Sequence, residues 1–285
     1  MFKETVKNEL RKNYKGCFMN QPYKIQNGNS NYENHPIIQN LSNTVNYWSS
    51  GKTKTFQAGL PKKQIRNEIL KSLSITTVEE IFPFMEQVYL NPGEYIYQPD
   101  DIINYLYFPE TAVISDFQIL EDGKTLEVAM IGREGIAGIN SVFNSHSSPN
   151  WLQVSISGKA LRIDSTIFRR EFNNCEVLQN LFFDYINMYI AQISQKVICN
   201  NHHSVEERLC CWLLMISDRC ALNNLPLTQE QIAGFLGVHR PSITLITQSL
   251  REKGIIDYVR GKISILDKEK LEVLSCDCYS TTKIM

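Results

Sequence analysis

The sequence predicts an α+β protein with an N-terminal β domain, one long helix and a C-terminal winged helix-turn-helix. Three observations predict it. Short β-like runs separated by turn signals recur about every ten residues over 88–164. A run with neither Pro nor Gly spans residues 176–200. Two helical patterns around a glycine turn, followed by two strand patterns, occupy residues 228–266.

Length and composition bound the class of protein. The 285 residues allow two domains plus an extension, and 43% apolar with 21% charged residues is typical of globular chains. No apolar run reaches the roughly 18 residues that a membrane-spanning helix needs. The N-terminus is positively charged but lacks the apolar core of a secretory signal. We therefore expect a cytoplasmic protein with no membrane partner.

Charge divides the chain into segments. Residues 1–72 hold 12 Lys and Arg against 4 Asp and Glu, residues 73–199 hold 7 against 16, and residues 200–285 hold 10 of each. Composition changes near Gly59, after an Asn-rich stretch with little periodicity. We expect a polar, basic and loosely ordered extension over 1–58, a β domain over 59–170, a long helix over 171–202 and a C-terminal domain over 203–278.

The β domain begins with a helix. Apolar residues at helical spacing predict it over 65–74, and Pro83 interrupts the chain soon after it. Strand patterns then alternate with turn signals, including a hairpin turn at 121–124 whose Gly123 supplies a positive φ. These strands suggest a small barrel, roll or sandwich. The absence of βαβ alternation and of a phosphate-binding GxxxxGK[ST] motif disfavours a nucleotide-hydrolysing fold.

Helices follow the strands. Asp164 or Ser165 can cap a short helix over 166–174. In the long helix, apolar residues recur with a mean spacing near 3.5, at positions 178, 181, 182, 185, 186, 189, 190, 193 and 197. A core helix would show a similar pattern, but so sustained a seam favours dimerisation. Ser204 and Glu207 form a capping box that begins a further helix over 204–222.

The last domain carries the clearest motif. Thr228 and Gln231 form a second capping box, and Gly237 ends that helix after two turns. A second helix runs from about Arg240 to Lys253 and ends at Gly254. Two strands then flank an Arg260-Gly261 turn. Helix, glycine turn, helix and β-hairpin together predict a winged helix-turn-helix.

A winged helix-turn-helix implies double-stranded DNA as a partner, because the major groove admits one α-helix. Arg240 stands at the start of the second helix, where its planar fork suits guanine. Gln229 starts the first helix, where backbone amides face phosphates. The predicted DNA-binding residues are Thr228, Gln229, His239, Arg240, Pro241, Ser242, Thr244, Leu245, Thr247, Gln248, Arg260 and Lys262.

The segment LTQEQIAGFLGVHRPSITLITQSLREKGIIDYVRGKISILD, residues 227–267, resembles the Crp/Fnr superfamily of bacterial transcription factors, and the resemblance extends over about 60–278. It implies a cyclic-nucleotide-binding-like β-roll (a double-stranded β-helix, jelly-roll-like), a homodimer joined through 176–200 and a near-palindromic DNA site. RNA polymerase is a further candidate partner. Arg240 matches the family's base-reading arginine. Pro241 and Leu245 replace its frequent Glu and Arg, so we expect a different operator.

The resemblance weakens in the sensory domain. Residues 132–144 are similar to the Gly-Glu segment of cyclic-nucleotide binders, but residues 148–152 read Ser-Pro-Asn-Trp-Leu where the family's phosphate-gripping arginine should fall. Burying a phosphate without a cationic partner would be costly. The iron–sulfur branch of the family uses an N-terminal cysteine cluster, whereas residues 1–170 contain only Cys17. We expect no cyclic nucleotide, no iron–sulfur cluster and no other cofactor.

Neither an enzyme nor a metal site is predicted. The sequence shows no nucleophile–base–orienter set, no phosphate loop and no CxxC among its eight cysteines. The alternative function is a thiol- or metal-responsive regulator that senses through Cys and His. Its candidates are His202-His203 with Glu206-Glu207, Cys210-Cys211 and Cys276-Asp277-Cys278. The two thiolates of Cys276 and Cys278 alone are too few for a closed zinc site. We expect His202-His203 to lie in a solvated hinge region and at least one of Cys210-Cys211 to lie in the core.

Overall fold

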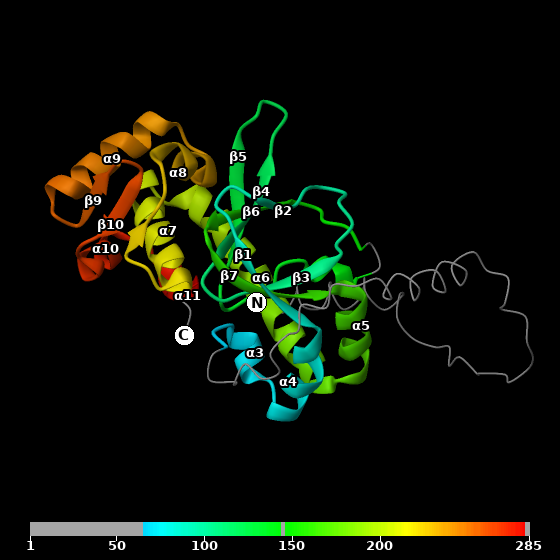
Figure 1. Cartoon of the computed structure of the whole chain (residues 1–285). Coiled ribbons are helices and arrows are strands. Elements are labelled where there is room, and N and C mark those ends of the chain that lie inside the picture. Colours follow the sequence, from blue (N-terminus) through cyan, green and yellow to red (C-terminus); the bar gives the residue numbers. More distant parts are fainter. Residues whose placement is uncertain (1–64, 144–145, 283–285) are drawn as a thin grey trace, which may run out of the picture. The chain divides into compact units, whose positions relative to one another are not determined.

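The computed structural model describes residues 65–143 and 146–282 (Figure 1). The expected extension over 1–58 and Cys17 lie outside the described residues. The described chain begins with two short helices, α3 (Glu68–Ser72) and α4 (Ile75–Ile81), and a 3-10 turn at Phe82–Phe84. Asn67 caps α3 and Ser74 caps α4, each with its side-chain oxygen. The helix expected over 65–74 is therefore present, but shorter.

Seven strands form two antiparallel sheets, which together make the β-roll. One sheet has the order β1-β7-β3 and the other β2-β6-β4-β5. The 121–124 hairpin turn joins β4 to β5, with Gly123 at φ +80°. The strands are β1 (Met85–Leu90), β2 (Tyr95–Tyr97), β3 (Tyr105–Pro109), β4 (Val113–Ile119), β5 (Thr125–Ile131), β6 (Trp151–Ile156) and β7 (Gly158–Asp164).

The long helix expected after the roll is present as α6 (Glu176–His202), preceded by α5 (Ser165–Asn174). Asp164 caps α5 by accepting from the backbone N–H groups of Thr166 and Ile167. One face of α6 packs on the roll through Leu178, Phe182 and Tyr185, all buried. Its opposite face remains open to solvent.

The C-terminal elements follow the expected order and add two helices that the sequence did not predict. The winged helix contains α7 (Val205–Cys220), α8 (Gln229–Leu236), α9 (Arg240–Glu252) and a sheet in the order β8-β10-β9. The additional helices are α10 (Lys268–Leu274) and α11 (Cys278–Thr282). The three strands are β8 (Asn224–Leu225), β9 (Ile256–Val259) and β10 (Lys262–Ile265).

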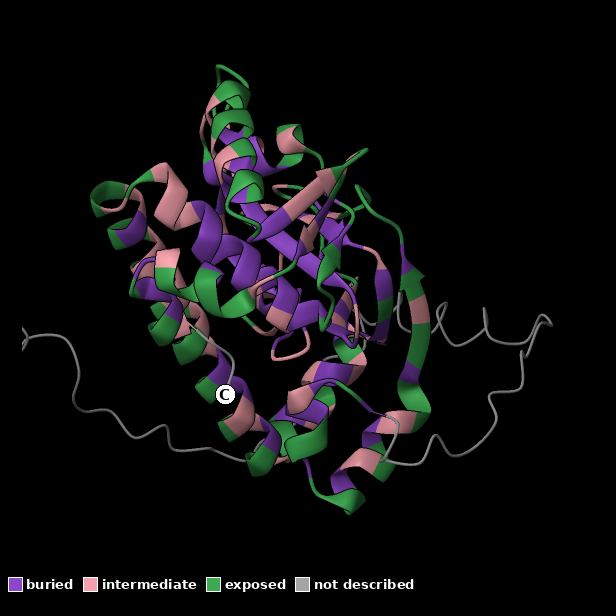
Figure 2. Ribbon diagram, turned by 90° about the vertical axis from the view of Figure 1, so that its left-hand side faces the viewer, coloured by how far each residue is buried: buried purple, intermediate pink, exposed green. Residues whose placement is uncertain are grey.

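The core runs from the winged helix into the roll. Buried residues of α7 share one apolar cluster with Val113, Met130 and Ile156 of the roll. Figure 2 shows buried positions concentrated inside the fold and exposed ones on its outer faces. Among the described residues, no helix has both the length and the apolar character needed to cross a membrane.

Candidate nucleic-acid interface

The helix-turn-helix is built by local signals that the sequence displays. The Thr228 hydroxyl accepts from the Gln231 backbone N–H, and the Gln231 side chain accepts from the Thr228 N–H, which completes the predicted capping box. Gly237 ends α8 at φ +64°, as predicted. A side chain at Gly237 would also meet Leu126, because its Cβ would lie 2.9 Å from Leu126 Cδ1. This glycine therefore serves both the turn and the close approach of the β4–β5 hairpin.

Most predicted DNA-binding residues lie on the surface. Arg240 occupies the first turn of α9, and its side chain is 63% exposed. Its guanidinium lies 3.8 Å from the exposed carboxylate of Glu230, an ion pair too solvated to hold it in place. Gln229 and Ser242 are half-buried. The exposed predicted residues are Thr228, His239, Arg240, Pro241, Thr244, Leu245, Gln248, Arg260 and Lys262.

Thr247 is placed differently from the other predicted contacts. It is 2% exposed, and its hydroxyl donates to the Ile243 carbonyl while accepting from Gln229 Nε2 at 2.8 Å. The Thr244 hydroxyl donates to Gln229 Oε1, also at 2.8 Å. These bonds fasten the start of α8 to the middle of α9. Thr247 therefore positions the two helices, because its buried hydroxyl is bonded to Gln229 of α8 and to the Ile243 carbonyl of α9.

The wing is a tight hairpin. Arg260 and Gly261 both have positive φ, +48° and +77°, which is the conformation of a two-residue turn that matches strand twist. Arg260 carries a conformational cost at this position, because it has a Cβ. Both Arg260 and Lys262 are exposed, so the turn presents two cationic side chains beside the α8–α9 unit.

Two buried polar contacts join α7 to the roll, and sequence reasoning missed both. Trp212 Nε1 donates to Glu127 at 2.8 Å, where Glu127 also accepts from Ser115 and Lys196. Arg219 Nε lies 2.8 Å from Glu134. The partners of each pair are 85 residues apart in the chain. The signal that identifies these contacts is the burial of the charged side chains of Glu127 and Arg219, and a sequence does not show which residues are buried.

Glu134 belongs to the segment that is similar to the family's Gly-Glu motif. Its Oε1 accepts from the Gly132 backbone N–H and from Arg219. In residues 148–152, where the family's phosphate-gripping arginine should fall, the Ser148 hydroxyl donates to the Asn150 carbonyl, and Trp151 begins β6. Glu134 Oε1 and the Ser148 hydroxyl are thus engaged within the fold, whereas Glu134 Oε2 is buried without a hydrogen-bond partner.

The structure assembles one group of thiols and imidazole that the sequence did not connect. The side chains of Cys199, His203, Cys276 and Cys278 bring four ligand atoms within 4.8 Å of one another.

The other residues that the sequence offered as metal or thiol candidates near this cluster make different contacts. Glu207 completes the predicted capping box with Ser204, Glu206 pairs with Lys253, and Cys210 and Cys211 are buried on α7. The neighbouring Cys199 thiol, 3.6 Å from its sulfur, holds the pKa of Cys276 well below its usual value.

Comparison with known proteins agrees with this architecture. Residues 87–175 match the cyclic nucleotide-binding domain, and residues 207–274 match the Crp-like helix-turn-helix domain. The nitrogen fixation regulation protein FixK of Bradyrhizobium diazoefficiens is 21% identical over 214 residues, which is 73% of this chain and 89% of FixK.

Solved structures show the same fold at low identity. FixK2 from Bradyrhizobium japonicum gives a TM-score of 0.58 at 15% identity, covering 67% of this chain and 98% of FixK2. A Crp/Fnr-family transcriptional regulator from Thermus thermophilus gives 0.56 at 18% identity, covering 67% of this chain and 98% of its own.

A β-roll of the cyclic nucleotide-binding type, followed by a long helix and a winged helix-turn-helix, defines a DNA-binding transcription regulator. The predicted fold and class are confirmed. The chain belongs to the Crp/Fnr family.

Proposed function

We propose that this chain acts as a homodimer that reads a near-palindromic DNA site through the first turn of α9. The observation that carries the proposal is Arg240, which projects into solvent at the N-terminal end of α9, three residues after the glycine that ends α8. Recognition helices contact base edges through their N-terminal residues, and arginine bonds bidentately to guanine. Arg260 and Lys262 would contact the phosphate backbone beside it.

The homodimer is supported by the solvent-facing side of α6. Phe183, Ile190 and Val197 are spaced by seven residues and are 51%, 55% and 58% exposed. Ile186 and Ile193 lie three residues after the first two and are half-buried. These five positions are the a and d positions of a coiled-coil seam. Leu178, Phe182 and Tyr185 pack on the roll from another face of α6. Of the five seam residues only Ile186 also packs against that core, whereas the exposed Phe183, Ile190 and Val197 can meet the same seam of a second copy.

An effector would act on the arrangement of the two α9 helices. The Thr125 hydroxyl donates to the Gly234 carbonyl at 2.8 Å, so the β4–β5 hairpin touches α8 directly. A ligand that prefers one arrangement of roll and winged helix shifts the population toward it. The effector we propose is not a cyclic nucleotide, because Ser148–Leu152 supplies no cation for its phosphate and Glu134 is already paired with Arg219.

The test is selection of bound fragments from genomic DNA at about 150 mM salt, where purely electrostatic binding weakens steeply. Wild type should enrich a two-fold-symmetric site. Arg240→Ala should lose that site, while Arg170→Ala, which removes an exposed charge from α5, should keep it. Equal enrichment by Arg240→Ala would contradict the assignment of α9. An asymmetric single half-site would contradict the dimer.

A second candidate function, regulation through metal or thiol chemistry, is favoured by one specific observation. Three thiols and an imidazole converge where α6 ends and α7 begins. That position lies between the proposed dimer seam and the winged helix.

A further inference from the structure

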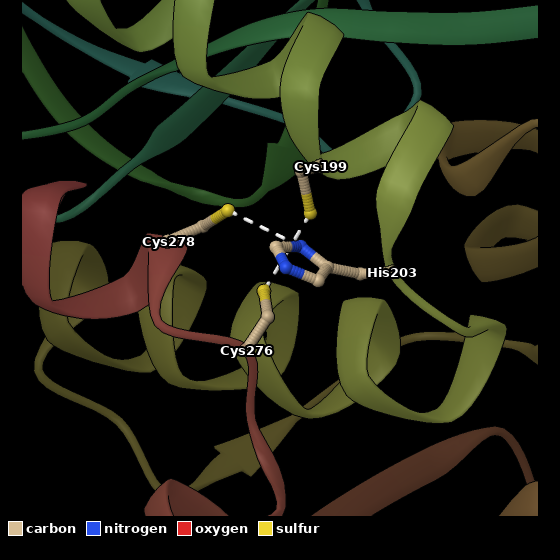
Figure 3. A group of neighbouring side chains, drawn as sticks. All are labelled: Cys199, His203, Cys276 and Cys278. Carbon is tan, nitrogen blue, oxygen red and sulfur yellow. Dashed lines mark hydrogen bonds between the residues drawn. The ribbon is translucent and has the colours of Figure 1, made fainter.

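The four converging side chains come from two distant segments. Cys199 and His203 are one helical turn apart at the end of α6, whereas Cys276 lies in the connection between α10 and α11 and Cys278 begins α11. Figure 3 shows all four side chains directed toward a common centre, two from each segment. The three cysteines are buried and His203 is half-buried.

Their distances fit one tetrahedral metal ion. Two thiolate sulfurs at the usual zinc–sulfur distance of about 2.3 Å lie about 3.8 Å apart around a tetrahedral centre. Here Cys199 Sγ and Cys276 Sγ are 3.6 Å apart, and Cys278 Sγ is 3.4 Å from His203 Nδ1. All four ligand atoms lie within 4.8 Å of one another, which is too compact for ligands of a multi-iron cluster separated by bridging sulfides.

The surroundings are those of a metal ligand set. His203 presents Nδ1 to the sulfurs, while its Nε2 lies 3.3 Å from the Asp277 carboxylate. A carboxylate is one of the acceptors, with backbone carbonyls and waters, that fix the tautomer of metal-bound histidines through their second nitrogen. Gln195, one turn before Cys199, donates to Cys278 Sγ at 3.0 Å. A thiolate at Cys278 would be stabilised by that donor.

The charge of a loaded site would also be compensated. Three thiolates around a divalent cation leave one net negative charge. Arg208 lines the same cavity as Cys199 and Cys278, and its Nε is buried without a hydrogen-bond partner. Arg208 Nη2 is anchored on the Leu236 carbonyl of α8. A cation fixed at this place favours an anionic site.

We propose that Cys199, His203, Cys276 and Cys278 bind one Zn²⁺ ion as a closed, structural site. Soft thiolate ligands in tetrahedral geometry select zinc, and four protein ligands leave no position for a substrate. Binding displaces the remaining thiol protons, and no electron is transferred. The ion ties the C-terminal tail to the end of α6. It therefore holds α6 and α7 at the junction marked by His203 and Ser204.

The sequence alone predicts no metal site here, because only the Cys276-x-Cys278 pair is recognisable in it. The two missing ligands lie more than 70 residues earlier, on another element. The structural site goes beyond the DNA-reading proposal, and its test is independent of DNA binding. Failure to bind zinc would leave the DNA-reading proposal intact. Failure to bind DNA would likewise leave the zinc proposal intact.

The experiment measures the metal content of the full chain, purified under reducing conditions without chelators. We expect about one zinc ion per chain. Cys278→Ser and His203→Gln should each lose most of it. Cys220→Ser is the matched control, because Cys220 is equally buried on α7 but its thiol donates to the Ile216 carbonyl, away from the cluster. Its zinc content should equal that of wild type.

A second measurement on the wild-type chain keeps the test decisive if a variant fails to fold. Zinc is removed with a chelator and replaced by Co²⁺, whose visible spectrum reports tetrahedral thiolate ligation. Absence of both zinc and a cobalt–thiolate spectrum would overturn the proposal. So would iron with acid-labile sulfide, or a Cys199–Cys276 disulfide in a non-reduced digest of freshly purified protein.

Discussion

Arg219 of α7 and Glu134 of the roll form a buried ion pair, with Nε and Oε1 2.8 Å apart and side chains only 3% and 13% exposed. The pair lies where the winged helix meets the roll. Its guanidinium also donates to the Met215 carbonyl of its own helix. Since the Cβ position of Gly132 would lie 2.6 Å from Arg219 Cβ, no larger residue fits beside it.

Glu134→Gln should destabilise the protein by about 3–5 kcal/mol, because it leaves the Arg219 charge buried and unpaired. Urea unfolding measures the change. Glu171→Gln, which breaks the exposed pair with Arg170, is the control and should cost less than about 1 kcal/mol. Adding Arg219→Met to Glu134→Gln should recover part of the loss. If Glu134→Gln costs as little unfolding free energy as Glu171→Gln, the Arg219–Glu134 pair is solvated and not buried.

Ile190→Glu should dissociate the proposed dimer, because a charge at the centre of an apolar seam must be desolvated on association. Sedimentation analysis would show a monomer at concentrations where wild type is dimeric. Met188→Glu is a closely matched control, since Met188 is 54% exposed against 55% for Ile190 but lies on the side of α6 away from the seam. Dissociation by both variants, or by neither, would contradict the seam.

Thr247→Val should weaken both folding and DNA binding. The substitution keeps the side-chain volume but removes the hydroxyl that accepts from Gln229 and donates to Ile243. We expect a loss of about 1–2 kcal/mol in unfolding free energy. Gln229 would then hold α8 against α9 only through the bond from Thr244. Thr244→Val, at an exposed position, should cost less stability; an unchanged unfolding midpoint for Thr247→Val would contradict its positioning role.

Asp116 should make stability depend on pH. Burial raises the pKa of Asp116 to about 6, even though the Tyr189 hydroxyl donates to its carboxylate. Between about pH 4 and 6 the folded protein therefore retains a proton that the unfolded chain has released. The stabilisation that this proton provides is fully present below about pH 4 and is lost as pH rises through about 6. The loss in unfolding free energy amounts to up to about 3 kcal/mol.

The check is urea unfolding of wild type and Asp116→Asn at several pH values. Asp116→Asn cannot titrate at this position, so its unfolding free energy should not show this loss. Relative to wild type, the unfolding free energy of the variant should therefore increase as pH rises from about 4 to 7. Asp122→Asn, at an exposed position of the hairpin turn, should follow the wild-type profile. A constant difference between wild type and Asp116→Asn across the range would show that Asp116 titrates normally.

Local signals in the sequence predicted local structure well. The capping boxes at Ser204 and Thr228 and the glycine stop at Gly237 each depend on residues at most four positions apart, and each is present. The nine apolar positions of the long helix predicted its length but not its faces. A spacing of 3.5 does not reveal which stripe packs on the roll and which remains open, since that depends on the neighbouring strands.

The features that could not be predicted depend on distant partners. Thr247 looked like a surface threonine because the sequence does not show that Gln229 folds back over it. Cys199 and Cys276 are 77 residues apart, and only the return of the tail to the end of α6 brings them together. The two last helices were missed because each is a turn or two long, below the length at which periodicity is informative.

Trp212 gives the protein an intrinsic optical reporter. Its indole N–H is bonded to Glu127 of the roll, and its ring stacks on Phe235 of α8 with centroids 5.7 Å apart. Any movement of the winged helix away from the roll breaks the first contact while leaving the second. The emission of this indole would therefore register the proposed change of arrangement without an attached dye, and a library of metabolites could be screened by fluorescence.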